Sequence, residues 1–194
     1  MARSQQQKAE SRQAIMRSAA NLFREKGLEG VTIAEVMDGA GLTHGGFPRH
    51  FASKEELVTA TLAELFVAET RAPSLPTYDL RAFARAYLHP EHRAAPGAGC
   101  VFAALGPEMA RAPGPTREVL TAAIERQIET FASMTVGEGA VEGRAAAIGT
   151  WATMIGAMIL ARIATSEALA GEILASARIF LDAEEESIRS SPCR

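Results

Sequence analysis

The chain has 194 residues, of which 47% are hydrophobic and 22% charged, an ordinary composition for a soluble globular protein of one or two domains. Its net charge of −3 argues against binding of polyanions through bulk charge, and its two cysteines, Cys100 and Cys193, exclude a disulfide framework. The charge is unevenly distributed, because residues 1–54 hold eight Lys or Arg and five Asp or Glu, whereas residues 55–194 hold twelve and eighteen. A basic front end on an acidic body is typical of local phosphate binding.

The first residues of the chain predict a polar arm followed by a helix. Residues 1 to about 8 are polar and contain no apolar segment typical of a signal peptide. From about Ala9 to Lys26 apolar residues recur on one helical face, and Gly27 is expected to end this helix as a C-cap. The residues of that face are Ile15, Ala19, Leu22 and Phe23.

The next stretch predicts two short helices joined by a glycine-containing turn. Thr32 is the expected N-cap of the first helix, and Gly39 and Gly41 suit a tight corner after it. Thr43 is then expected to cap a second short helix, His44 to His50. Two short helices joined in this way form the unit that places its second helix in the DNA major groove.

A capping box, Ser53-x-x-Glu56, begins the helix that follows, which is expected to run from residue 53 to residue 70. The run AANLFREKGLEGVTIAEVMDGAGLTHGGFPRHFASKEEL resembles the N-terminal domain of the tetracycline-repressor (TetR/AcrR) family. The resemblance implies an all-α fold with an N-terminal three-helix helix-turn-helix DNA-binding domain, residues 1–52, and a C-terminal helical ligand-binding and dimerisation domain, residues 53–194. Helix 53–70 would link the two domains.

The second short helix and its edges supply the residues expected to bind DNA. Thr43 can offer its hydroxyl and the helix N-terminal amides to a phosphate. His44 and Arg49 carry polar groups suited to phosphates or base edges, and Phe47 is either a thymine-methyl contact or a core residue. The full set is Thr32, Thr43, His44, Gly45, Gly46, Phe47, Pro48, Arg49, His50 and Lys54.

Pro48 departs from the family pattern, which usually has an aromatic residue, most often Tyr, at this position. The hydroxyl of that Tyr commonly touches a phosphate in the family, and proline cannot make the contact. Proline also removes one backbone amide and disfavours a helical conformation of the residue before it. We therefore expect a shortened or reshaped recognition helix and weaker DNA binding.

The rest of the chain predicts helices and loops, with no strand alternation. The expected helices are Tyr78–Leu88, Cys100–Arg111, Thr116–Met134, Val141 to about Ala164 and Ser166 to about Ile188, with loops at His89–Gly99 and Gly137–Gly143. The stretch Ala145–Ala161 carries no charge, but it contains Gly and Thr, and no aromatic belt frames it. We interpret it as a helix buried on most sides, with no membrane partner and a cytoplasmic location.

The resemblance also implies that the helical body holds an inducer, which the family binds inside this domain. Met and aromatic side chains make adaptable apolar pockets; each of them alone is more typical of an ordinary core, and the resemblance favours a pocket for the group. The candidate ligand-binding residues are Cys100, Phe102, Leu105, Met109, Phe131, Met134, Trp151, Met154 and Met158. Cys100 lies at the N-terminus of a predicted helix, a position that favours a reactive thiolate. Some family members sense electrophiles or oxidants with a comparable Gly-Cys, and the alternative is a small buried apolar residue.

The last two predicted helices carry apolar stripes and small residues, and they resemble the four-helix dimer interface of the family. No metal site, cofactor motif or catalytic motif is expected, since His89-x-x-His92 has no further ligand nearby. The predicted function is therefore a homodimeric, one-component repressor, not an enzyme, released from a pseudo-palindromic double-stranded DNA operator by a largely apolar small-molecule inducer. The alternative is a ligand-binding or Cys100-sensing helical dimer whose DNA binding is weakened by Pro48.

Overall fold

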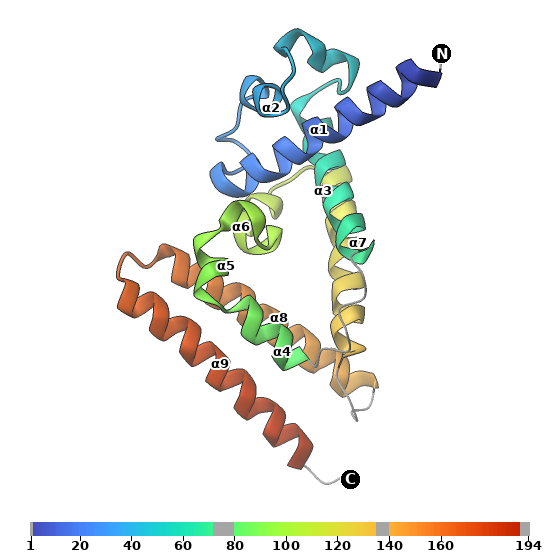
Figure 1. Cartoon of the computed structure of the whole chain (residues 1–194). Helices are drawn as coiled ribbons and strands as arrows, with labels where there is room; N and C mark the ends of the chain where they lie inside the picture. Colours follow the sequence, from blue (N-terminus) through green and yellow to red (C-terminus); the bar gives the residue numbers. More distant parts are fainter. Residues whose placement is uncertain (1, 72–79, 135–139, 191–194) are drawn as a thin grey trace. The chain divides into compact units, whose positions relative to one another are not determined.

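The computed structural model describes residues 2–71, 80–134 and 140–190, and every regular element in these ranges is a helix (Figure 1). This confirms the all-α prediction. By their contacts the described residues fall into two compact units. Unit 1 comprises those of Met1–Pro73 and Ala104–Ala123, and unit 2 comprises those of Ser74–Ala103 and Ile124–Arg194. The expected division after residue 52 remains a prediction, and Cys193 lies outside the described residues.

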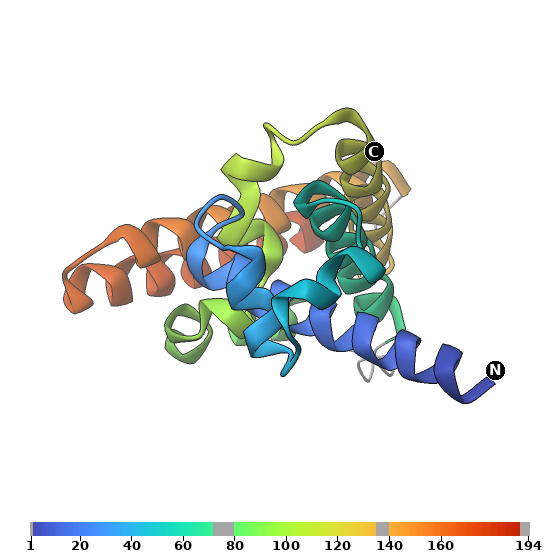
Figure 2. The same cartoon turned by 90° about the horizontal axis from the view of Figure 1, so that it is seen from above.

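Unit 1 begins with four helical elements: α1 (Ala2–Lys26), α2 (Ile33–Gly39), the 3-10 helix η1 (His44–Arg49) and α3 (Lys54–Arg71). In Figure 2, α2 and η1 lie beside α1, with which α2 and α3 both make contact. The polar arm expected over residues 1–8 is wrong, because α1 already begins at Ala2. The Gln, Lys, Glu and Ala residues of this stretch are good helix formers, and no proline or glycine interrupts them.

The core of unit 1 is the small apolar cluster expected of a three-helix domain. Phe23, Val36 and Phe51 are each about 1% exposed. Gly27 ends α1 as predicted, with φ +80, a conformation that favours glycine. The segment from residue 104 onward adds two polar contacts, in which the Leu28 amide donates to Glu108 at 2.6 Å and the hydroxyls of Thr59 and Thr116 lie 2.7 Å apart.

The chain continues through seven further elements: α4 (Leu80–Tyr87), α5 (Pro90–Ala94), η2 (Pro96–Ala98), α6 (Val101–Met109), α7 (Gly114–Ala132), α8 (Ala140–Ile163) and α9 (Glu167–Ser190). The loop predicted at residues 89–99 is wrong, because α5 and η2 occupy it. Pro90 does not only stop α4 but opens α5 at its first position, where a missing amide costs nothing. The His89 side chain accepts the amide of Glu91 and so caps the new helix.

In unit 2, α8 and α9 form a hairpin of long helices, and α4 packs against both (Figure 1). The segment Gly143–Ile163 of α8 is long and apolar enough to cross a membrane by length and composition, with a mean hydropathy of 1.5. Only 33% of this segment is buried. The expectation that the helix is buried on most sides is therefore wrong for a single chain, because α4, α5 and α9 cover part of its circumference.

Candidate functional site

The first helix of the predicted helix-turn-helix is fixed by its N-terminal cap. The Thr32 hydroxyl accepts the Glu35 amide at 3.2 Å, and the Glu35 carboxylate accepts the Thr32 amide at 2.8 Å, which confirms Thr32 as the N-cap. Lys26, at the end of α1, lies 2.8 Å from the other Glu35 oxygen. The Lys26 hydrogen bond and then the Thr32 amide lower the pKa of Glu35 to about 2, so that this carboxylate is charged at neutral pH.

The second helix is a 3-10 helix, and its cap differs from the first. Gly41 has φ +69 in the turn, as expected of a tight corner. Thr43 has the extended backbone of an N-cap residue but makes no side-chain capping hydrogen bond, so the expectation that it caps the helix is wrong. Pro48 has no amide to donate to residue 44, and its ring disfavours the α-helical path. The segment instead closes through bonds such as Gly46 N to Thr43 O at 2.9 Å.

Phe47 and Arg12 hold this 3-10 helix onto unit 1. Phe47 is 5% exposed and stacks on Phe51 with ring centroids 5.8 Å apart, which favours the core alternative over a thymine contact. The Arg12 guanidinium lies 3.9 Å from the centroid of the Phe51 ring and donates to the carbonyl of His50. It also pairs with Glu56 at 3.7 Å. Arg12 was not predicted from the sequence, because its partners are distant along the chain.

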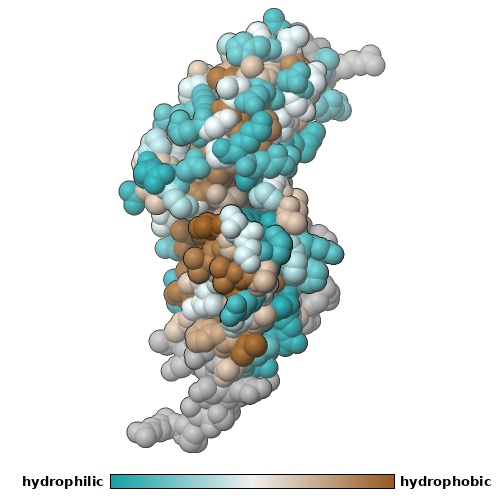
Figure 3. Space-filling model, turned by 90° about the vertical axis from the view of Figure 1, so that its left-hand side faces the viewer, coloured by the Kyte–Doolittle hydropathy of each residue, from teal (hydrophilic) through white to brown (hydrophobic). Residues whose placement is uncertain are grey.

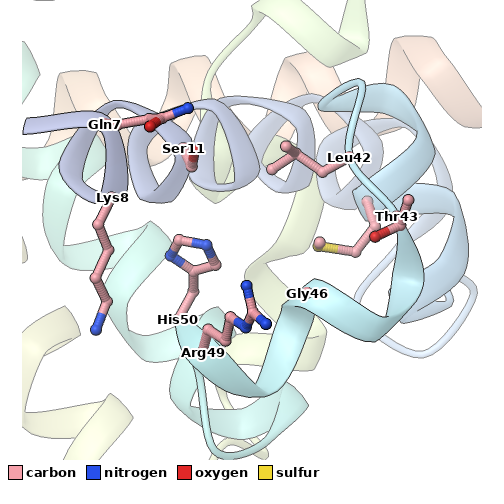
Figure 4. Close-up of a pocket in the computed structure, with 9 residues that line it drawn as sticks. Gln7, Lys8, Ser11, Leu42, Thr43, Gly46, Arg49 and His50 are labelled. Carbon is pink, nitrogen blue, oxygen red and sulfur yellow. The ribbon is translucent and has the colours of Figure 1, made fainter. Parts of the chain in front are cut away.

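An open groove of about 600 Å³ runs between α1 and η1 (Figure 4). Lys8 from α1 and Arg49 and His50 from the η1 end bring cationic or titratable groups to it, and in Figure 4 the His50 ring lies between the other two. The lining residues are Gln7, Lys8, Ser11, Met37, Leu42, Thr43, Gly46, Arg49 and His50. Of the ten predicted DNA-binding residues, five lie on η1 without being buried, namely His44, Gly45, Gly46, Pro48 and Arg49, and Thr43 and His50 flank this helix, also unburied.

His50 is the titratable group of this groove. Its Nδ1 atom is buried and has no hydrogen-bond partner among the described residues. Burial first, and then the positive charges of Lys8, Arg12 and Arg49, lower the pKa of His50 below its ordinary value of 6.5. An anion placed in the groove would reverse the second effect, since it favours the protonated imidazole.

Lys54, the last predicted DNA-binding residue, starts α3 and lies half-buried with its Nζ 3.5 Å from the Glu29 carbonyl. The predicted capping box, Ser53-x-x-Glu56, is present in altered form. The Ser53 hydroxyl accepts the Glu56 amide at 3.1 Å, whereas the Glu56 carboxylate accepts the amide of Ala52 rather than that of Ser53.

Seven of the nine predicted ligand-binding residues belong to the apolar cluster of unit 2 or pack against it. They are Cys100, Phe102, Phe131, Met134, Trp151, Met154 and Met158. The centroid of the Trp151 ring lies 5.0 Å from that of Phe102 and 6.1 Å from that of Phe131. The other two, Leu105 and Met109, are buried in unit 1 instead.

Cys100 is a half-buried free thiol immediately before α6, next to a histidine whose ring nitrogens are both used. The Cys100 amide donates to His92 Nε2 at 3.1 Å, and His92 Nδ1 lies 2.7 Å from the Tyr87 carbonyl. Since Nε2 accepts, Nδ1 carries the proton and the ring is neutral. Burial lowers the pKa of His92, in keeping with this state. Its nitrogens are therefore not free for a metal, and the described residues hold no group of three His, Cys, Asp or Glu that could bind one.

Comparison with known proteins places both halves of the chain. Residues 15–61 match the family described as bacterial regulatory proteins, tetR family, and residues 76–176 match the tetracyclin repressor-like C-terminal domain. The HTH-type transcriptional repressor KstR2 of Mycobacterium tuberculosis (strain ATCC 25618 / H37Rv) is 44% identical over 48 residues, which span 25% of this chain and 24% of that protein.

Solved structures share the whole fold. A TetR transcriptional regulator from Chloroflexus aurantiacus J-10-FL has a TM-score of 0.70 and 25% identity, covering 96% of this chain and 98% of that one. The reduced form of NemR from E. coli has a TM-score of 0.69 and 19% identity, covering 88% and 94%. The helix-turn-helix, the helical body and these matches together lead to one conclusion: the chain belongs to the tetR family of DNA-binding transcriptional regulators.

Proposed function

We propose that this chain is a repressor that binds a pseudo-palindromic operator as a homodimer and leaves it when a small molecule binds in unit 2. The groove between α1 and η1 is the observation that best supports a DNA-binding surface. There Lys8, Arg49 and His50 converge, and the exposed polar residues of η1 adjoin them. Cationic groups beside an exposed helix suit a phosphate backbone and the adjacent base edges.

Repression, rather than activation, is supported by the relative KstR2, which is described as a repressor. The match spans 25% of this chain and 24% of that protein, so it supports repression through one segment of the chain only. A regulator that binds DNA acts inside the cell, and we assign it to the cytoplasm.

The test is selection of bound duplexes from a random DNA pool by the purified protein at one stated, moderate salt concentration. We expect enrichment of a short inverted repeat. The Arg49→Gln variant should lose enrichment, whereas Arg126→Gln, which removes an exposed arginine on α7, should retain it. If the folded wild type enriches no sequence, the DNA-reading part of the proposal is wrong.

A ligand in unit 2 is supported by the grouping of the predicted apolar residues around Trp151. Release requires the ligand to prefer the form of the protein that does not bind DNA, because a ligand with equal affinity for both forms shifts neither. A screen that measures loss of the selected operator by fluorescence anisotropy tests this step. A ligand that binds without changing operator affinity would contradict induction.

A second candidate is sensing of electrophiles by Cys100, with DNA binding weakened by Pro48. The supporting observation is the surroundings of the thiol, which is half-buried and lies near the phenol of Tyr87 and the guanidinium of Arg162. N-ethylmaleimide serves as the probe: the sulfur adds to one alkene carbon and the thiol proton goes to the other. Cys100 sensing predicts that the treatment lowers operator affinity in the wild type and leaves Cys100→Ser unchanged; equal effects on both would exclude it.

A further inference from the structure

Arg162, on α8, is a half-buried cation without a carboxylate partner among the described residues. Its Nη2 donates to the His92 carbonyl at 3.0 Å and its Nε to the Arg93 carbonyl at 3.4 Å. Its Nη1 is buried and has no hydrogen-bond partner in the described part of the chain. The neighbouring Arg93 differs, since it pairs with Glu167 at 2.7 Å. A charge held out of water without a counter-ion is costly, so this guanidinium suits an anion from outside the chain.

Tyr87, on α4, supplies a second unpartnered donor beside the first. The residue is only 8% exposed, and its hydroxyl makes no hydrogen bond of ordinary geometry with a described residue. Burial, and then the neighbouring Cys100, raise the pKa of the Tyr87 phenol, whereas Arg162 acts in the opposite direction. The phenol therefore keeps its proton and can donate it to an acceptor oxygen.

The segment at Gly99 fixes these groups in place. A Cβ atom at Gly99 would lie 2.7 Å from His92 Nε2 and 3.0 Å from Arg162 Nη2, so no larger residue fits without displacing them. His92 is neutral and bonded at both nitrogens to backbone groups, so it brings neither a charge nor a free donor. The positive charge at this position comes from Arg162.

We propose that Arg162 and Tyr87 bind the carboxylate of a small organic acid, whose hydrocarbon part packs on the adjoining apolar cluster of unit 2. This rests on the proposed function of unit 2 as a ligand-binding body. The guanidinium donates from Nη1 and the phenol from its hydroxyl, one to each carboxylate oxygen. A carboxylate fits better than a phosphate dianion, because the site offers one positive charge and burial of the second negative charge would be uncompensated. Tyr87 and Trp151 belong to the cluster, and Cys100 and Phe102 pack against it, so that it supplies the apolar part.

Sodium octanoate and its neutral isostere octanamide are the probes, and Trp151, the only tryptophan of the chain, is the reporter. We expect octanoate to change the Trp151 emission and raise the melting temperature, with octanamide binding at least about tenfold more weakly, the usual value of a charge-assisted hydrogen bond. Arg162→Gln should abolish the preference for the acid. Arg144→Gln, which removes an exposed arginine of the same helix, should preserve it.

Tyr87→Phe keeps the test decisive if Arg162→Gln does not fold, because it removes only a hydroxyl that makes no hydrogen bond of ordinary geometry with a described residue. The folded Tyr87→Phe protein should bind octanoate several-fold more weakly, with a smaller loss for octanamide, whose uncharged carbonyl accepts a weaker hydrogen bond. The proposal fails if the wild type binds neither probe, if it binds both equally, or if the variants keep the preference. Operator selection is measured without either probe, so a protein that binds octanoate but enriches no DNA would overturn the proposed function and not this inference.

Discussion

Pro48 determines the geometry of the segment that we expect to meet DNA. It lies exposed inside η1, where an α-helix would need its amide. Pro48→Tyr restores that amide and adds a phenol able to reach a phosphate. We predict operator binding about tenfold tighter, the value of one hydrogen bond to a charged group, in a fluorescence anisotropy titration.

Pro48→Ala is the matched control, because it restores the amide without the phenol. If the phenol is the source of the tighter binding, Pro48→Ala should bind the operator only slightly more tightly than the wild type does. Unchanged or weaker binding by Pro48→Tyr would show that the reshaped helix already suits this operator.

The two histidines with lowered pKa values, His50 and His92, predict how stability depends on pH. In the folded state the pKa of each imidazole lies below its ordinary value of 6.5. As the pH falls past 6.5, the unfolded chain therefore binds more protons than the folded chain does. The free energy of unfolding should therefore fall as the pH decreases from about 7.5 to about 5.5. The pKa values of the Glu35 and Glu167 carboxylates are also lowered. They too make the free energy of unfolding fall with decreasing pH, but only below their ordinary pKa of 4.5.

Urea unfolding at the two pH values measures this dependence, and His50→Gln removes one of its sources. The variant should lose less stability than the wild type over the same interval. An equal loss in both proteins would mean that His50 does not titrate differently in the folded and unfolded chain.

At the scale of the element, the two short helices of the helix-turn-helix, α2 and η1, differ in their caps. Thr32→Ala removes a reciprocal capping box and should lower the free energy of unfolding by about 1 kcal/mol. Thr43→Ala removes a hydroxyl that caps nothing and should leave it nearly unchanged. Both variants should bind the operator more weakly if both hydroxyls reach phosphates. Urea unfolding with anisotropy titration separates these effects, and equal destabilisation would contradict the difference in caps.

The end of α6 supports the turn after α1. Glu108→Ala leaves the part-buried amide of Leu28 without its acceptor and should cost about 1–3 kcal/mol in urea unfolding. Glu108→Gln keeps an acceptor oxygen and should cost less. Glu118→Ala, at an exposed position of α7, controls for loss of a carboxylate. A Glu108→Ala protein as stable as the wild type would show that water replaces the carboxylate.

Local patterns allowed most helices to be predicted, and contacts distant in the chain account for the misses. Thr32 and Thr43 are alike in sequence, yet only the helix after Thr32 has a Glu at the third position to complete the box. Glu108 meets Leu28 across 80 positions, and no periodicity indicates such a pair. The apolar stripe of residues 100–111 predicted one ligand site, although Leu105 and Met109 are buried in unit 1 rather than in the cluster that holds Phe102.

At the scale of the whole molecule, the α8–α9 hairpin leaves an apolar surface uncovered. Figure 3 shows hydrophobic residues on the face of this hairpin that is turned to the viewer. Exposed large apolar side chains occur on both helices, at Ile148, Leu160, Ile163, Leu169, Ile179 and Phe180. Contiguous apolar surface of this kind marks an interface, and a second copy of the hairpin would complete a four-helix bundle.

We therefore predict that Phe180→Glu converts a dimer into a folded monomer in sedimentation equilibrium, because the new carboxylate would be buried unpaired in the bundle. Ile124→Glu makes the same change at an exposed position of α7 and should leave the dimer intact. Because two heads on one operator bind with a high effective concentration, the monomer should lose operator affinity by a factor of a hundred or so. Arg49→Gln should lose operator affinity while remaining dimeric, which separates failure of the reading surface from failure of assembly. A wild type that is monomeric in solution and still selects an inverted repeat would instead mean that two copies of the chain pair only when they bind DNA.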